Sequence, residues 1–166
     1  MADRPTQRRF AVMGDNVFKV ADKILSNQRI CRLLKYEVRN PFSEDLPNVD
    51  GLELLNKQVL ITPKLYDADT EKMSYLIFVF DDFVVNTLNP EFKVSTVRFD
   101  IACPYTEWML DGQSLRPYLI MEEIDNMFNG AKLSGIGNLQ FHRADQLTLS
   151  PQISGYSMRY KINEFN

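Results

Sequence analysis

The sequence lacks most of the features that identify an enzyme or a membrane protein at once. It contains one histidine and two cysteines in 166 residues, and none of them stands in a recognisable metal-binding or nucleophile motif. Its longest apolar run falls far short of the roughly 18 residues that an ordinary transmembrane helix needs. The N-terminal residues MADRPTQRRF carry arginines with no apolar segment behind them, so we expect no secretory signal.

The sequence also lacks an excess of basic residues. Nineteen lysines and arginines stand against 22 aspartates and glutamates, which gives a formal net charge of −3. Tight nonspecific binding of nucleic acid relies on a basic excess that neutralises phosphates. We therefore expect no such binding, although a protein through which DNA merely passes would not need it. The 45% of hydrophobic residues and the length fit one globular domain.

The cysteines and the histidine are predicted to have no chemical role. Cys31 lies in a helical pattern and Cys103 on the apolar face of a predicted strand. Both are predicted to be buried free thiols, which fits a reducing compartment, with a disulfide or a ligand role as the alternative. His142 is predicted to lie at the surface or at a sheet edge, because no nucleophile motif accompanies any serine or cysteine.

The clearest structural pattern runs from residue 75 to residue 104. Residues 75–80 are apolar throughout and rich in aromatic and β-branched residues, which predicts a central strand covered on both faces. Residues 97–103 alternate between apolar and mostly polar positions, which predicts a half-buried strand. Asn89 and Pro90 between them provide a turn, so the two strands are expected to form an antiparallel hairpin.

Helical patterns flank this hairpin. Residues 1–13 are predicted to be a flexible basic arm, and residues 14–166 a single domain. Residues 15–36 have apolar positions at helical spacing, interrupted at Ser26 and Asn27, which predicts two helices. Residues 115–129 predict a further helix that covers the sheet and ends at Asn129 and Gly130.

Further strands are predicted on both sides of these elements. Residues 54–66 read as a strand, followed by a hairpin tip at residues 66–73, so that three strands form a meander up to Pro104. After residue 133 the alternating pattern returns and predicts closing strands. The predicted fold class is α+β, with N-terminal helices, an antiparallel β-meander covered by one helix, and closing C-terminal β-strands.

The candidate functional residues are charged side chains on the polar faces of two strands. Arg98 and Asp100 project from one strand, and Arg159 and Lys161 from the last. Such mixed charge can simply provide solubility. It can also dock copies of one subunit side by side, because complementary charges fix partner and register. We therefore predict these four residues as subunit-interface residues.

Other groups of residues allow further interpretations. Asp81, Asp82 and Asp100 could converge across the hairpin and hold a hard cation in a metal-dependent hydrolase, but the chain lacks a loop of regularly spaced oxygen ligands. We therefore predict no metal, no cofactor and no catalytic residue. Glu122 and Glu123 are predicted to lie on the solvated face of their helix. Two aromatic residues, Tyr105 and Trp108, could serve either an interface or the core of the monomer.

Three segments carry a resemblance to a known family. They are ILSNQRICRLLKY at residues 24–36, VRFDIACPYTEWMLDGQSLRPYLIMEEIDNMFNG at residues 97–130, and LSGIGNLQF at residues 133–141. These segments resemble a group of phage structural proteins, and the order of the elements along the chain resembles the neck and tail terminator (tail completion) proteins of tailed bacteriophages. The resemblance covers nearly the whole chain beyond the basic arm.

This resemblance implies a structural role in the virion. Members of that family form a ring, commonly a homohexamer, at the head-tail junction, where it terminates the tail tube and joins it to the head connector. The expected partners are copies of the same chain, tail-tube proteins and neck proteins. DNA would transit the lumen without sequence-specific binding, and no membrane would be involved. The alternative is a phage accessory protein or ligand-binding module with a groove between sheet and helix.

Overall fold

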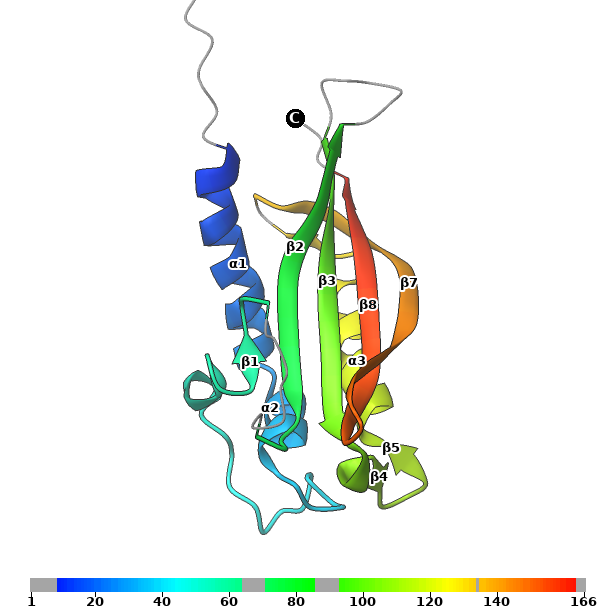
Figure 1. The fold of residues 1–166 in the computed structure, drawn as a ribbon. Helices are drawn as coiled ribbons and strands as arrows, with labels where there is room; N and C mark the ends of the chain where they lie inside the picture. The colour runs from blue at the N-terminus through cyan, green and yellow to red at the C-terminus, as the bar shows by residue number, and fades with distance from the viewer. Residues whose placement is uncertain (1–8, 64–70, 86–92, 134, 164–166) are drawn as a thin grey trace, which may run out of the picture.

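The computed structural model describes residues 9–63, 71–85, 93–133 and 135–163 of the chain (Figure 1). Its α-helices are α1 (Arg9–Leu25), α2 (Gln28–Lys35) and α3 (Arg116–Phe128), with 3-10 turns η1 (Gly51–Leu54) and η2 (Tyr105–Glu107). Within these described ranges, no helix is long and apolar enough to cross a membrane. The helices pack against one face of a β-sheet, which confirms the predicted α+β class.

The two N-terminal helices are separated where the sequence predicts a break. Asn27 is the N-cap of α2, and its side-chain oxygen accepts a hydrogen bond of 3.1 Å from the backbone N–H of Ile30. An asparagine at this position satisfies one of the N–H groups that a helix leaves unpaired at its start. The first helix begins at Arg9, inside the segment 1–13 that was predicted as an arm, and residues 1–8 lie outside the described residues.

The main sheet contains six strands in the described residues. Their order is β1 (Val59–Leu60), β2 (Tyr75–Val85), β3 (Lys93–Pro104), β8 (Ile153–Asn163), β7 (Gly137–Ser150) and β6 (Lys132–Leu133). All neighbouring pairs are antiparallel except β1 and β2, which are parallel. Figure 1 shows the long strands β2, β3, β8 and β7 side by side. The antiparallel pairing predicted for β2 and β3 is confirmed, and the turn predicted at Asn89 and Pro90 lies outside the described residues.

The predicted three-stranded meander is wrong in its first strand. Within the described part of the strand expected over residues 54–66, which ends at residue 63, the main sheet takes only β1, which runs parallel to β2 and therefore is not its hairpin partner. Gln58 fixes this arrangement, because its carbonyl accepts a 2.7 Å bond from the N–H of Leu76 and its amide donates to Ser74 O at 3.3 Å. Most of the expected hairpin tip at residues 66–73 lies outside the described residues.

The predicted central position of β2 is also only partly correct. The centre of the sheet is formed by β3 and β8, and β2 has a strand on its outer side only at two register positions, Leu76 and Ile77. Its first residues are nevertheless buried on both faces, because Tyr75 and Ile77 pack in a second, smaller apolar cluster on the side away from the helices. The continuous apolar run reflects this local cover and not a central place in the sheet.

Helix α3 covers the middle of the sheet, as predicted. Ile120, Ile124 and Phe128 are buried, and the Phe128 ring stacks on Phe99 of β3 with 5.1 Å between centroids. The helix follows a small hairpin of β4 (Met109–Leu110) and β5 (Ser114–Leu115). The sheet is covered by all three helices and not by one, since the buried residues of α1 and α2 belong to the same core. We call the side of the main sheet away from the helices the open face.

One β-bulge decides which side chains of β7 reach the open face. The pairing of β7 with β8 shifts register between Phe141 and Arg143. Because side chains alternate along a strand, the extra residue moves the following ones to the opposite face. Leu139 and Phe141 therefore point toward the helices, whereas Arg143 and Asp145 lie on the open face. Strands β7 and β8 are the closing strands that the sequence predicts after residue 133.

Both cysteines are buried free thiols, as predicted. Burial raises the pKa of Cys31 to about 11 and the pKa of Cys103 to about 12. For Cys103 the burial outweighs a hydrogen bond from Ser74 and the charge of Arg116, which act in the opposite direction. Neither thiol is therefore ionised near neutral pH, as inert structural cysteines should be.

We expect the free energy of unfolding to fall as the pH rises from about 9 toward 11. In the unfolded chain a thiol ionises near pH 8.5, so the unfolded state loses its protons before the folded state does. Each such group costs about 1.4 kcal/mol per pH unit in that window. Urea unfolding at a series of pH values measures this slope, and it should become shallower in Cys103→Ala. An unchanged slope in that variant would contradict the assignment.

Candidate functional site

Three arginines lie next to one another across the open face. Arg98 on β3 pairs in register with Arg159 on β8, and Arg159 pairs in register with Arg143 on β7. Like charges placed directly opposite one another in a sheet are destabilising unless they are compensated. Two residues further along each strand, toward the small hairpin, Asp100 on β3 and Asp145 on β7 lie on either side of Ser157 on β8.

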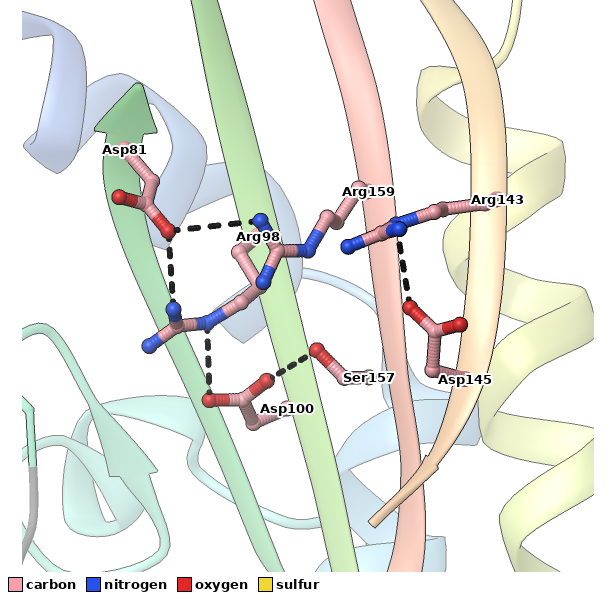
Figure 2. Close-up of polar contacts among 7 residues, drawn as sticks. All are labelled: Asp81, Arg98, Asp100, Arg143, Asp145, Ser157 and Arg159. Carbon is pink, nitrogen blue, oxygen red and sulfur yellow. Dashed lines mark hydrogen bonds and ion pairs between the residues drawn. The ribbon is translucent and has the colours of Figure 1, made fainter. Parts of the chain in front are cut away.

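The carboxylates compensate the arginines in an ordered way (Figure 2). Arg98 bridges two of them, with Nη1 at 2.8 Å from Asp81 Oδ2 and Nε at 3.1 Å from Asp100 Oδ2. Arg159 Nη1 lies 3.8 Å from the same oxygen of Asp81. The remaining oxygen of Asp100 accepts a 2.6 Å hydrogen bond from Ser157 Oγ. On β7, Arg143 Nε lies 3.1 Å from Asp145 Oδ2.

We call these residues the arginine–aspartate network; its members are Asp81, Arg98, Asp100, Arg143, Asp145, Ser157 and Arg159. The network contains equal numbers of positive and negative side chains, so its formal charge is zero. The part on β2 and β3 is half-buried, with 26% of the Arg98 and 15% of the Asp100 side chain exposed. Partly exposed pairs contribute little stability individually, so the main effect of the network is to hold charged groups of both signs in fixed positions.

The structure brings together three of the four residues that the sequence predicts for an interface. Arg98, Asp100 and Arg159 belong to the network, whereas Lys161 lies on the same face two residues beyond Arg159 on β8. Lys161 is exposed, and it forms no ion pair with any other residue in the described ranges. Of the four, it is the charge that remains free to meet another molecule.

The alternative metal site finds no support in this geometry. The carboxylates of Asp81 and Asp100 both face the guanidinium of Arg98, which occupies the position that a cation would take. The side chain of Asp82 lies outside the described residues. Among the residues that the structure describes, no group of three or more histidine, cysteine, aspartate or glutamate side chains is placed to hold a metal ion.

One predicted surface residue has a different role. Glu122 is exposed, as predicted, but Glu123 is not part of the solvated face, because only 13% of its side chain is exposed. It forms an ion pair with Arg29 and accepts a 3.2 Å hydrogen bond from the Asn27 amide. The start of α2 packs against α3 at this point, so the pair joins two helices that are far apart in the sequence.

A small hollow of about 290 Å³ lies between α3 and strands β7 and β8. Its lining residues are Met121, Glu122, Asp125, Asn129, Phe141 and Met158. Two of the polar groups at its edge are engaged within the chain, since Asp125 accepts a 2.8 Å bond from the Tyr160 hydroxyl and Asn129 Oδ1 accepts one of 3.1 Å from the N–H of Phe141. This is the groove that a ligand-binding module would use, but it offers few converging groups to a ligand.

The other singled-out residues lie apart from the network. His142 is exposed on β7 at the bulge, where its side chain is on the sheet's edge strand, as predicted. Trp108 is partly buried, and its indole N–H donates to the carbonyl of Cys103 at 3.2 Å. Tyr105 is 63% exposed. Burial therefore explains the tryptophan, and the tyrosine remains available on the surface.

Sequence reasoning missed four members of the network. Asp81 was considered only as a metal ligand, and Ser157, Arg143 and Asp145 were not singled out. The alternation of Ser157 with Met158 and Tyr160 would have placed it on the polar face of β8. Arg143 and Asp145 could not be placed that way, because the bulge before them changes the face on which they lie.

Comparison with family models of known proteins finds a match over most of the chain. The model of the YomW family matches residues 27–162, which is well over half of the chain. The matched range begins at the N-cap of α2 and ends in β8, so it includes every strand of the main sheet. A search of curated proteins finds no match.

Proposed function

Because the chain belongs to the YomW family, which is associated with phages, we propose that it is a structural virion protein of the phage head-tail junction. In this proposal the copies form a ring, commonly a hexamer, that terminates the tail tube and joins it to the head connector. The genome passes through the lumen, and the protein assembles in the host cytoplasm. It binds no cofactor and carries out no turnover.

The observation that supports this role is the arginine–aspartate network on a face that no helix covers. Fixed charges of both signs on an exposed sheet are suited to register a second subunit, since charge complementarity selects the partner and its orientation. The network is electrically neutral, so it does not attract DNA in the way that a basic surface would. Both properties suit a subunit that contacts its neighbours and lets DNA pass.

A closed ring requires two different patches on each subunit. Head-to-tail contacts join one surface of a copy to another surface of the next, and the series closes when the rotation permits. Arg98 and Asp100 are already engaged within their own chain, so they fix the shape of one patch. Lys161, which is exposed beside them, is the residue we assign to the direct contact between copies.

We expect the purified protein to form rings that are visible by electron microscopy, and we expect Lys161→Glu to reduce their fraction by about ten-fold or more. Reversing an interfacial charge replaces an attraction by a repulsion, and a difference of about 1.4 kcal/mol is ten-fold in an equilibrium constant. Light scattering at low and high salt measures the assembly, which should weaken with salt because rim charges are screened.

The matched control is Lys57→Glu, an exposed lysine just before β1 at the far edge of the sheet. It makes the same change in net charge, and we expect it to leave ring formation unchanged. Rings that tolerate Lys161→Glu as well as the control would remove Lys161 from the contact. A wild-type chain that stays monomeric at high concentration, also with tail-tube and connector proteins added, would rule out the ring.

A further inference from the structure

The outer edge of β7 is covered only over its first residues. β6 pairs with Asn138 and Gly137, and the backbone of Leu139 then bonds to Gly130 and Ala131 at 2.8 and 3.1 Å. The N–H of Phe141 still finds a partner in Asn129 Oδ1 at 3.1 Å. Beyond this residue, no described segment bonds to the outer side of the strand, and the side chains of residues 142–146 are exposed on both faces of the sheet.

The direction of the backbone groups along this edge follows from these bonds. Leu139 and Phe141 direct their backbone groups outward, and alternate residues of a strand do so. The bulge after Phe141 moves this alternation by one residue, so that Ala144, Gln146 and Thr148 direct their N–H and C=O groups outward. An edge of this kind is a template for pairing with another strand.

The side chains on this edge are complementary to a second copy of themselves. In an antiparallel pair centred on Ala144, the two Ala144 residues face one another, and each Arg143 lies opposite the partner's Asp145. The outward backbone groups of Ala144 then meet as a hydrogen-bonded pair, which the register requires. The small alanine side chain leaves room at the symmetry axis. Figure 2 shows that Arg143 and Asp145 both project from β7 on the open face.

We propose that two copies of the chain pair through the β7 edge, about a two-fold axis at Ala144, so that their main sheets form one continuous sheet. The occupant is a second copy because the opposite charges of Arg143 and Asp145, two residues apart with the small Ala144 between them, make the edge self-complementary. This two-fold joint goes beyond the proposed ring and is a different contact from its head-to-tail joint, since it uses the same patch on both copies. Its presence or absence therefore does not decide whether the ring forms.

Charge-swapped variants test the pairing. Arg143→Asp places two aspartates opposite two aspartates, and Asp145→Arg places two arginines opposite two arginines. Each variant alone is expected to dimerise on the order of ten-fold more weakly than the wild type, because two cross-strand attractions become repulsions. Mixed in equal amounts, the two variants are expected to form a heterodimer with affinity near that of the wild type.

Sedimentation of the full-length chain measures these dimers. The wild-type and swapped edges are compared in chains that also carry Lys161→Glu, at concentrations at which this substitution suppresses ring formation. The mixing step separates pairing between chains from the ion pair within one chain, which both variants lose and which mixing does not restore. A wild-type chain that stays monomeric, single variants that dimerise as tightly as the wild type, or a mixture that forms no heterodimer would each overturn the proposal.

The register is tested by cysteine cross-linking. Because Cys31 and Cys103 are buried, an introduced cysteine is the accessible one. Ala144→Cys is expected to cross-link two copies efficiently with a short bifunctional maleimide, because the two positions face one another at the axis. Thr148→Cys is the matched control on the same edge, and it is expected not to cross-link, since the two copies of this residue lie far apart in that register. Equal cross-linking of both variants would contradict the Ala144-centred pairing.

Discussion

Replacing Arg116 by alanine is expected to destabilise the fold by about 4 kcal/mol or more. Its guanidinium is buried and donates to four backbone carbonyls, with the bonds to Glu107, Tyr36 and Val38 at 3.0, 2.8 and 2.8 Å and a further short bond to Leu33. A buried acceptor left without a partner costs about 1–3 kcal/mol. The loss approaches the whole stability of an ordinary domain, so the variant should be largely unfolded at physiological temperature.

The arginine has this effect because one side chain joins the end of α2, the segment that follows it and η2. The carbonyls of Leu33 and Tyr36 end α2, Val38 follows that helix, and Glu107 belongs to η2. Burial lowers the pKa of Arg116, and the nearby Cys103, Glu107 and Glu37 oppose that shift. An arginine is so basic that it stays charged in such a place, and its five N–H groups suit several acceptors at once.

Arg39→Ala provides the control, measured by urea unfolding followed through the single tryptophan. Arg39 lies one residue after Val38, but its side chain is 67% exposed and reaches Asp111 only at 4.0 Å. An ion pair of this kind contributes about 0–1 kcal/mol, so the control should unfold almost as the wild type does. A loss of less than about 1 kcal/mol in Arg116→Ala would show that water replaces the guanidinium without cost.

Elements set by local chemistry could be predicted from the sequence. The break at Asn27 follows from the capping preference of asparagine. The end of α3 follows from Asn129 and Gly130, because Gly130 adopts a positive φ of 71° that favours glycine. The antiparallel pairing of β2 and β3 follows from the apolar patterning of their residues. In each case the residues that determine the structure are neighbours in the sequence.

Elements set by contacts between distant segments could not be predicted in this way. The apolar run at residues 75–80 indicated burial on both faces correctly, but it could not show that the cover comes from a small cluster containing Leu60 and Ile153. Arg116 stands at the start of α3 with nothing in the sequence to show that α2 ends beside it. The same holds for Glu123, which pairs with Arg29 across the two helices.

The candidate site illustrates both situations. Arg98, Asp100 and Arg159 were predicted to lie on the polar faces of their own strands, because these strands alternate regularly, and the structure places all three on one face of the sheet. The β7 part of the network depends on one extra residue at the bulge. A bulge leaves little trace in a single sequence, because it changes the direction of side chains without changing their composition.

Replacing Gly155 by alanine is the second change expected to have a large effect, with a loss of about 3 kcal/mol or more. Gly155 lies on β8 opposite Ala102 of β3, and a Cβ atom at this position would lie 1.9 Å from the carbonyl oxygen of Ile101. The obstructing atom belongs to the backbone of the neighbouring strand and cannot rotate away. The two central strands would have to separate, as overpacked interiors do at a cost that is usually 1–3 kcal/mol and sometimes more.

The separation of β3 and β8 should also disturb the network two residues away. The hydrogen bond from Ser157 Oγ to Asp100 joins these same two strands, so Gly155→Ala should weaken ring formation as well as stability.

Gly14→Ala is the matched control, because no atom lies within 4 Å of an added Cβ there and the residue is in α1. This control should raise stability by about 0.5–1 kcal/mol, since alanine favours a helix over glycine. Thermal unfolding of the two variants measures both effects. If Gly155→Ala unfolds at the wild-type temperature, β3 and β8 make room for the added Cβ atom without cost, and the argument from their close approach is wrong.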